Sequence, residues 1–231
     1  MTKNKALVLL SAGLDSSVNL YEAHLQMDVV LVLTFDYGQK AAKQEIAAAK
    51  NLAADLMRPH KVVPLPFFAD FNRSSLFVAS ENIPTGSRVD IHNLKTSQET
   101  AQSVWVPNRN GIFLNIAAGY AEALGASFVI PGFNAEEAAT FTDNTEDYMK
   151  ALDHSFIFST SNQIKVKCFT SALNKTEIVQ KALDLKMPLE KIWPCYFAGP
   201  HWCGQCESCL RSKNAMKKAG LDEKKYFREG P

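Results

Sequence analysis

One stretch near the N-terminus carries residues whose types and spacing could bind a phosphate group. An apolar run, 7–10, ends in Ser11-Ala12-Gly13-Leu14-Asp15-Ser16-Ser17, and helical spacing resumes at Val18. A strand that turns into a helix presents free backbone N–H groups and the positive end of the helix dipole to an anion. The serine hydroxyls add donors, and Gly13 lacks a Cβ that would hold an anion away. We therefore expect residues 10–17 to bind phosphate, although an ordinary serine-capped corner has a similar composition.

A second stretch with chemical potential is a group of cysteines near the C-terminus. Cys195, Cys203, Cys206 and Cys209 lie within fifteen residues, and the last three have C-x-x-C spacing. Four thiolates suit a tetrahedral Zn²⁺ in a closed, structural site, whereas an iron–sulfur cluster or unrelated buried thiols are the competing interpretations. His201 is more simply a surface residue, and Cys168 a small core residue of a strand. We predict that the four clustered cysteines hold zinc.

Composition restricts the class of protein and of partner. The chain has 231 residues, 46% hydrophobic and 21% charged, with a formal net charge of +1. This is a globular composition with no broad basic surface, so we expect small-molecule substrates and no direct binding of tRNA. The chain shows no signal-peptide pattern and no long apolar run, which predicts a cytoplasmic protein without membrane contact. In that reducing compartment, cysteines indicate a metal site before disulfides.

Strand-like and helix-like segments alternate along the chain, and this order must position both stretches. Apolar runs predict five strands, at 5–10, 29–35, 60–65, 127–130 and 164–169. Helical spacing follows the first loop to 26 and recurs at 39–57, from the residue after Asn110 to 124, at 145–158 and at 174–185, while 67–107 has little periodicity. The pattern predicts a doubly wound α/β fold with a mostly parallel five-stranded sheet, which binds ligands at the carboxyl ends of its strands. We expect an α/β domain over 1–190 and a zinc-binding helical segment, 191–231, packed on it.

The first stretch resembles a known phosphate-binding loop. Residues 11–17 are similar to the S-G-G-x-D-S-[ST] loop of the N-type (PP-loop) ATP pyrophosphatases, which split ATP into AMP and pyrophosphate. Ala12 stands where that family usually has glycine, and we expect its methyl group to fit if the local φ is negative. Further along, Phe35-Asp36-Tyr37-Gly38-Gln39, Val106-Pro107-Asn108-Arg109-Asn110 and the cysteine motif occur in the same order. Together they resemble the 7-cyano-7-deazaguanine synthase family of the queuosine and archaeosine pathways, over nearly the whole chain.

The resemblance implies a fold, a reaction and its residues. The fold would be adenine nucleotide alpha-hydrolase-like. The reaction would convert 7-carboxy-7-deazaguanine and ammonia to the nitrile through an adenylated carboxylate and an amide, using ATP and Mg²⁺ in a homodimer with structural Zn²⁺. Asp15 would orient Mg²⁺ or cap the helix, and Lys175, otherwise a solvated helix start, would meet the phosphates. The catalytic residues would be Asp15, Ser16, Arg109 and Lys175, and the nucleotide-binding residues Leu10, Ser11, Ala12, Gly13, Leu14, Asp15, Ser16, Ser17, Tyr37 and Gln39.

Two departures from the family pattern leave alternatives open. Asn108 replaces a glycine, and 139–145 replaces the family's S-G-Y-P-D-C-R, keeping only Asp143 and an aromatic residue, Phe141. We expect 132–143 to line the deazaguanine pocket. There the carboxylates of Glu136 and Glu137 could accept hydrogen bonds from a guanine-like edge, or belong to a solvated loop. A related ligase that acts on another carboxylate or stops at the amide, and a non-catalytic nucleotide-binding subunit, are the alternatives. The intact loop disfavours the last, and the missing glutaminase motif favours free ammonia.

Overall fold

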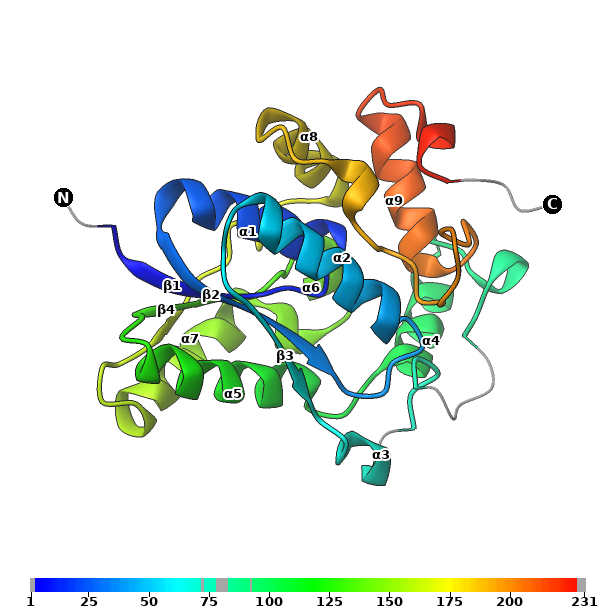
Figure 1. Ribbon diagram of the computed structural model, residues 1–231. Coiled ribbons are helices and arrows are strands. Elements are labelled where there is room, and N and C mark those ends of the chain that lie inside the picture. The colour runs from blue at the N-terminus through cyan, green and yellow to red at the C-terminus, as the bar shows by residue number, and fades with distance from the viewer. Residues whose placement is uncertain (1–2, 72, 78–82, 92, 228–231) are drawn as a thin grey trace.

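The apolar runs form one five-stranded parallel sheet in the computed structural model, which describes residues 3–71, 73–77, 83–91 and 93–227 (Figure 1). The strand order is β3-β2-β1-β4-β5, and every neighbouring pair is parallel. This order confirms the predicted fold class. The strands are β1 (Lys5–Leu9), β2 (Asp28–Asp36), β3 (His60–Pro64), β4 (Phe128–Ile130) and β5 (Lys165–Val166).

The fifth strand is shorter than the sequence suggests. Only Lys165 and Val166 pair, opposite Phe128 and Val129 of the three-residue β4, which offers no longer edge. Cys168 therefore follows the strand, and the expectation that it lies within one was wrong. Its thiol contacts the carbonyl of Phe133 at 3.4 Å.

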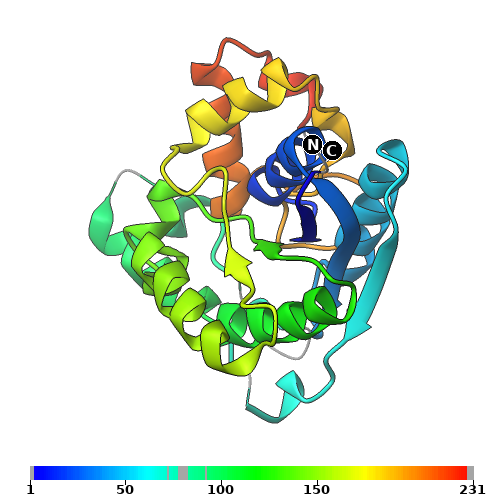
Figure 2. The same cartoon turned by 90° about the vertical axis from the view of Figure 1, so that its left-hand side faces the viewer.

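Helices cover both faces of the sheet, as a doubly wound fold requires. In Figure 1, α1 (Leu14–Gln26), α2 (Ala42–Asp55) and α8 (Lys175–Asp184) lie on one face, and α5 (Arg109–Ala123) and α7 (Glu146–Ser159) on the other. Figure 2 shows the strands between these two layers. Side chains of β1 alternate between the layers: Ala6 and Val8 join the core under α1, and Leu7 joins the core under α5. The period of two expected of a buried strand sets this division.

The segment 67–107, which shows little periodicity in sequence, contains short elements. Its residues 72, 78–82 and 92 lie outside the described part of the chain. The longest element, α4, is mostly polar over its 11 residues, and only its three apolar residues, Leu94, Ala101 and Val104, follow helical spacing. The segment contains α3 (Phe68–Phe71), η1 (Gly86–Arg88) and α4 (Leu94–Val104).

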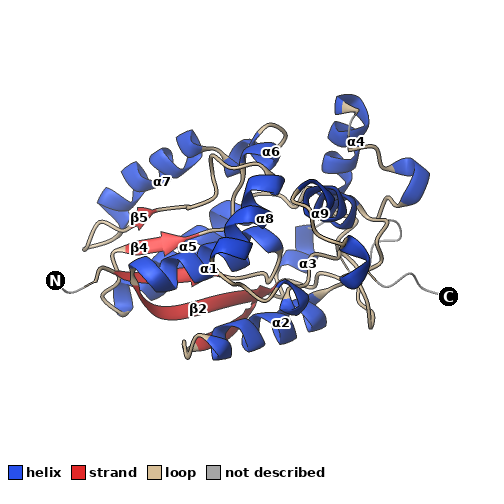
Figure 3. Cartoon of the chain, turned by 90° about the horizontal axis from the view of Figure 1, so that it is seen from above, coloured by secondary structure: helices blue, strands red, loops and turns tan. Residues whose placement is uncertain are grey.

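The C-terminal part of the chain continues the core rather than standing apart. Ile192, Cys195 and Trp202 belong to the same apolar cluster as α1 and α8. Figure 3 shows α4 and α9 (Glu207–Lys218) beyond the carboxyl ends of the strands. The remaining short elements are α6 (Ala135–Ala138), η2 (Thr142–Asn144), η3 (Leu189–Lys191) and η4 (Glu223–Lys225). None of the described helices combines the length and apolar character that crossing a membrane requires.

Candidate active site at the carboxyl end of the sheet

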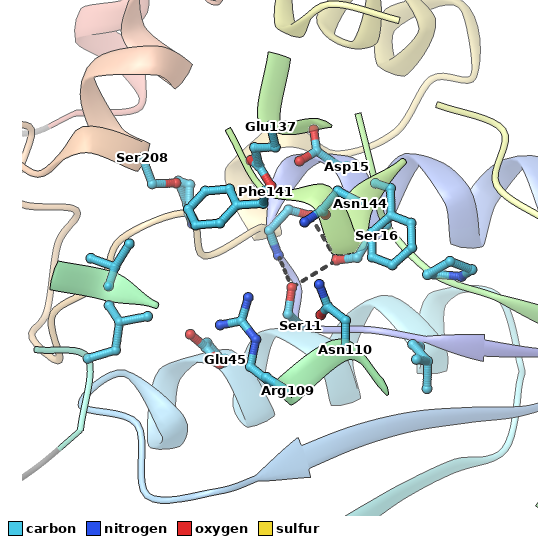
Figure 4. A pocket seen from close by; sticks show the side chains of 18 of the residues that line it. Ser11, Asp15, Ser16, Glu45, Arg109, Asn110, Glu137, Phe141, Asn144 and Ser208 are labelled. Atoms are coloured by element: carbon cyan, nitrogen blue, oxygen red, sulfur yellow. Dashed lines mark hydrogen bonds between the residues drawn. The ribbon is translucent and has the colours of Figure 1, made fainter. Parts of the chain in front are cut away.

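The loop after β1, residues 11–17, opens onto a cavity at the carboxyl end of the sheet and is called the phosphate loop below. The first hydrogen bond within α1 runs from Ser17 N to Gly13 O at 3.1 Å. The amides of residues 14–16 therefore have no acceptor in their own helix and are available to an anion. The hydroxyls of Ser11 and Ser16 lie 3.1 Å apart (Figure 4). Side chains of Ala12 and Ser17 point away from the cavity and are fully buried, whereas the rest of 10–17 lines it.

Ala12 does not have the negative φ that we expected. Its φ is +61°, in the left-handed region that favours glycine, and its side chain is 0% exposed. Its carbonyl accepts a 2.7 Å hydrogen bond from Trp193 N. Asn108, the other residue that replaces a family glycine, has φ +50°. Asparagine tolerates this conformation better than alanine does, so the strain falls mainly on Ala12.

Asp15 and Lys175 meet in a buried network of charges. Lys175 Nζ lies 2.5 Å from Asp15 Oδ2 and 2.9 Å from Glu137 Oε1. Asn134 Nδ2 donates to Asp15 Oδ2 at 3.1 Å. Lys175 is only 8% exposed, so it is not a solvated helix start. The helix cap of α1 is Gly13, without a side-chain cap bond, so Asp15 does not cap the helix.

The charges of this network stabilise one another. Burial alone would lower the pKa of Lys175, but Asp15 and Glu137 raise it above its ordinary value. Burial alone would raise the pKa of Glu137, but Lys175 holds it below its ordinary value. For Asp15, burial raises the pKa, and Lys175 opposes the rise. Asp15 Oδ1 is buried and has no hydrogen-bond partner among the described residues. That oxygen is suited to a further cation or donor, because an unpaired buried acceptor is costly.

Polar residues from the loop after β2, from α2 and from α5 form the opposite side of the cavity. In the view of Figure 4, Arg109, Glu45 and Asn110 lie across from Asp15 and Glu137, with Ser11 between. Arg109 donates to the hydroxyl of Tyr37 at 3.3 Å. Both residues line the cavity, as does Gln39.

Gln39 organises this side of the cavity. Its side chain accepts from Tyr37 N at 3.0 Å, donates to Phe35 O at 3.1 Å and donates to Glu45 Oε2 at 2.9 Å. It therefore fixes the loop after β2 and holds the carboxylate of Glu45. Burial raises the pKa of Glu45 to about 7, against the effects of Gln39 and Arg109. Sequence reasoning did not identify Glu45, because this residue stands in the predicted helix 39–57 without a motif.

The third side of the cavity extends from the end of β4 to α9. Gly132 approaches the phosphate loop so closely that a Cβ there would lie 2.6 Å from the Cα and N of Ser16. Arg211 of α9 pairs with Glu136 at 3.3 Å and with Glu207 at 2.7 Å. Glu136 also accepts from Lys175 N. Glu136 therefore forms an ion pair with Arg211, and Glu137 forms one with Lys175. The interpretation of these two glutamates as part of a solvated loop was wrong.

Sequence reasoning missed the contribution of α9. Residues of this helix that line the cavity follow the cysteines directly, but no motif distinguishes them from a solvated amphipathic helix. They are Glu207, Ser208, Arg211 and Ser212.

The four clustered cysteines come together as predicted. One sulfur atom from each of Cys195, Cys203, Cys206 and Cys209 lies within 4.8 Å of the others, and this set could hold a metal ion. Backbone N–H groups point at the sulfurs, for example Cys203 N to Cys195 Sγ at 3.3 Å. Gly204 takes φ +68° in the turn. The exposed His201 is not part of the group.

Comparison with known proteins gives matches over nearly the whole chain. Residues 5–220 match the family described as queuosine biosynthesis protein QueC. A protein of Bdellovibrio bacteriovorus is 60% identical over 231 residues, which cover 99% of this chain and 100% of that protein. A protein of Carboxydothermus hydrogenoformans is 47% identical over 211 residues, 91% of this chain and 97% of the relative. Both relatives are named 7-cyano-7-deazaguanine synthase.

A solved structure supports the fold assignment. It is a 4-thiouridine synthetase in complex with RNA and with bound ATP, superposed with a TM-score of 0.50 at 19% identity. The match covers 79% of this chain and 40% of the other. At this identity the similarity concerns the fold alone.

Proposed function

The chain belongs to the QueC family of queuosine biosynthesis proteins, and we propose that it converts 7-carboxy-7-deazaguanine and ammonia to 7-cyano-7-deazaguanine with ATP. The observation that carries the proposal is the convergence on one cavity of open helix amides, Lys175 and Arg109. A carboxylate can expel its oxygen only after that oxygen is joined to a good leaving group. We propose that the phosphate loop and Lys175 bind the triphosphate and that the carboxylic acid binds beside it in the same cavity.

The first half of the reaction makes the amide. A carboxylate oxygen of the substrate attacks the α-phosphorus of ATP, and the bond to pyrophosphate breaks. We propose that the amides of residues 14–16, the hydroxyls of Ser11 and Ser16, and Lys175 stabilise the charge on the departing pyrophosphate. Ammonia then attacks the acyl carbon, loses a proton, and AMP leaves with one substrate oxygen.

The second half removes the remaining oxygen. The amide oxygen attacks the α-phosphorus of a second ATP, and pyrophosphate leaves again. The nitrogen loses both of its protons as the C–O bond to AMP breaks, which leaves the nitrile. Arg109 presents a guanidinium whose donors match a phosphate or carboxylate oxygen. Catalysis here consists of positioning and charge stabilisation, since no covalent nucleophile is required.

The buried oxygen of Asp15 fits a hard cation. Asp15 Oδ1 lacks a partner within the described structure, whereas Oδ2 is held by Lys175 and Asn134. We propose that Asp15 Oδ1 holds Mg²⁺, which would neutralise phosphate charge. Lys175 then acts as the counterion that keeps this carboxylate oriented.

The cysteine cluster, Cys195, Cys203, Cys206 and Cys209, fits a structural Zn²⁺. An all-thiolate set of four with N–H groups directed at sulfur is the donor set of closed zinc sites. A bound Zn²⁺ would cross-link the four thiolates. The segment that the metal cross-links, 195–209, would then keep Trp193 in contact with the phosphate loop and keep α9 beside the cavity. We further propose a cytoplasmic homodimer that uses free ammonia and does not bind tRNA directly.

Product analysis tests the proposal. Purified protein would be incubated with ATP, Mg²⁺, ¹⁵N-ammonium and 7-carboxy-7-deazaguanine, and the products identified by mass spectrometry. We expect ¹⁵N-labelled nitrile, AMP and pyrophosphate. Accumulation of the amide would show that the second activation is absent. Binding of ATP without conversion of this acid would indicate another carboxylate and refute the proposal.

A further inference from the structure

Most carboxylates of the cavity are already engaged by cations. Asp15 and Glu137 share Lys175, and Glu136 and Glu207 share Arg211. A carboxylate paired in this way has less capacity to accept from a neutral base. Glu136 and Glu137, which the sequence analysis considered as hydrogen-bond acceptors for a guanine-like edge, are therefore poor candidates for binding the substrate base.

Two other cavity carboxylates, Glu45 and Asp143, form no ion pair with any residue that the structure describes. Asp143 lies in η2 and is half-buried. Its Oδ1 accepts from Asn144 Nδ2 at 3.1 Å, and the side chain of Asn110 and the backbone of Asp143 itself also donate to the carboxylate. Burial raises the pKa of Asp143, and Arg109 opposes the rise. A partly desolvated carboxylate that lacks an ion-pair partner favours a ligand that donates hydrogen bonds to it.

A pair of parallel aromatic rings lines the same cavity as Asp143. Phe141, two residues before Asp143, stacks on Trp105 with ring centroids 6.0 Å apart and an angle of 8° between the planes. Trp105 follows the end of α4 and is 38% exposed, so part of its surface is uncovered. Both residues line the cavity. Planar bases stack on such aromatic surfaces with little dependence on sequence or substituent.

We infer that this place selects the substrate base: Asp143 accepts hydrogen bonds from the amide N–H and the 2-amino group of a guanine-like ring that stacks on Trp105 and Phe141. The inference rests on the proposed function and deepens it. Two adjacent donors on that edge match the two oxygens of a carboxylate. Adenine presents one donor beside an unprotonated ring nitrogen, whose lone pair a carboxylate repels. The site therefore distinguishes the acid substrate from the adenine of ATP.

The position of the site also explains what survives in the altered stretch 139–145. Asp143 and an aromatic residue at 141 are the two features retained there, and in the inferred site Asp143 binds the edge of a guanine-like ring and Phe141 binds its face. The other positions of the stretch can change without removing this recognition. The inferred substrate is thus a guanine-like carboxylic acid rather than a different acid.

An analogue of the substrate tests the inference. Activity would be measured with 7-carboxy-7-deazaguanine and with its analogue that lacks the 2-amino group. Hydrogen bonds to a charged group contribute about 1.5–3 kcal/mol, which corresponds to a preference of about 10- to 150-fold for the parent acid in kcat/KM. We expect Asp143→Ala to remove most of this preference, and Phe141→Leu to raise the KM for the acid while the KM for ATP changes little.

Matched variants distinguish recognition from folding. Asp147→Ala, at an exposed position of α7 outside the cavity, should keep the full preference. If Asp143→Ala turns over the acid with an unchanged preference, or if Glu45→Ala loses it instead, the inference is wrong. If the wild type binds ATP but converts neither acid, the proposed function fails, and the inference fails with it.

Discussion

Replacing Ala12 by glycine tests the conformation on which the phosphate loop depends. Ala12 has φ +61° and is completely buried, and its carbonyl is tied to Trp193 N. Glycine adopts this conformation without a steric penalty, whereas alanine does not. The substitution leaves every backbone donor of the loop in place, so we expect ATP affinity to be retained.

The change in stability follows from three terms. Relief of the left-handed conformation stabilises the folded state by about 1–2 kcal/mol. The greater freedom of glycine in the unfolded chain costs about 0.4–1 kcal/mol. Loss of a buried methyl group costs about 0.8 kcal/mol. The sum lies within about 0.8 kcal/mol of zero, so Ala12→Gly should be nearly neutral.

The matched control is Ala49→Gly in α2. Ala49 is also 0% exposed, but it has a helical conformation that is unstrained for alanine, so glycine relieves no backbone strain there. Glycine there costs about 1 kcal/mol of helix propensity and about 0.8 kcal/mol for the methyl group. Urea unfolding of both variants should therefore show Ala49→Gly to be less stable than Ala12→Gly by at least about 1 kcal/mol. Equal destabilisation of the two variants would refute the assigned conformation of Ala12.

Four other predictions concern the cavity and the metal site. Gly132→Ala should lower stability by about 1–3 kcal/mol and weaken ATP binding, because the new Cβ would lie 2.6 Å from the backbone of the phosphate loop. The control Gly119→Ala, which has open space around the new Cβ, should change neither stability nor ATP binding in this way. The contribution of Glu45 to stability should fall as pH rises from about 4.5 to about 7, because folding raises the pKa of Glu45 to about 7 and the unfolded chain gives up that proton first. Urea unfolding over this range should therefore show the wild type losing stability relative to Glu45→Gln. Lys175→Met should abolish pyrophosphate release and cost about 3–5 kcal/mol, because it leaves the buried Asp15 and the partly buried Glu137 without their shared counterion. A stable, active variant would contradict this. Elemental analysis should find zinc in the wild type and less in Cys195→Ser, whereas iron with visible absorbance would exclude a zinc site.

Features with a local physical cause were predictable from the sequence. The alternation of apolar runs and helical spacing gives the parallel sheet and its covering helices, because each element buries its own apolar face. The cysteine cluster was predictable because its members lie close in sequence and the turn at Gly204 brings the sulfurs together.

Features that depend on tertiary contacts were not predictable. The ion pairs of Glu136 and Glu137 join α6 to residues far away in sequence, Lys175 and Arg211. The positive φ of Ala12 is imposed by the surrounding packing, since alanine itself disfavours it. The helix α4 has only three apolar residues, so the residue that follows it, Trp105, gave no sign of reaching the cavity.

Oxygen transfer from the acid to AMP is the most direct test of the central claim that the protein activates first a carboxylate, and then the amide made from it, at one nucleotide site. The measurement uses 7-carboxy-7-deazaguanine with both carboxylate oxygens labelled by ¹⁸O, followed by mass spectrometry of the nucleotides. The account predicts that each nitrile formed is accompanied by two AMP molecules, each with one ¹⁸O atom. Label in inorganic phosphate, or a nitrile formed with unlabelled AMP, would contradict adenylation of the carboxylate and of the amide.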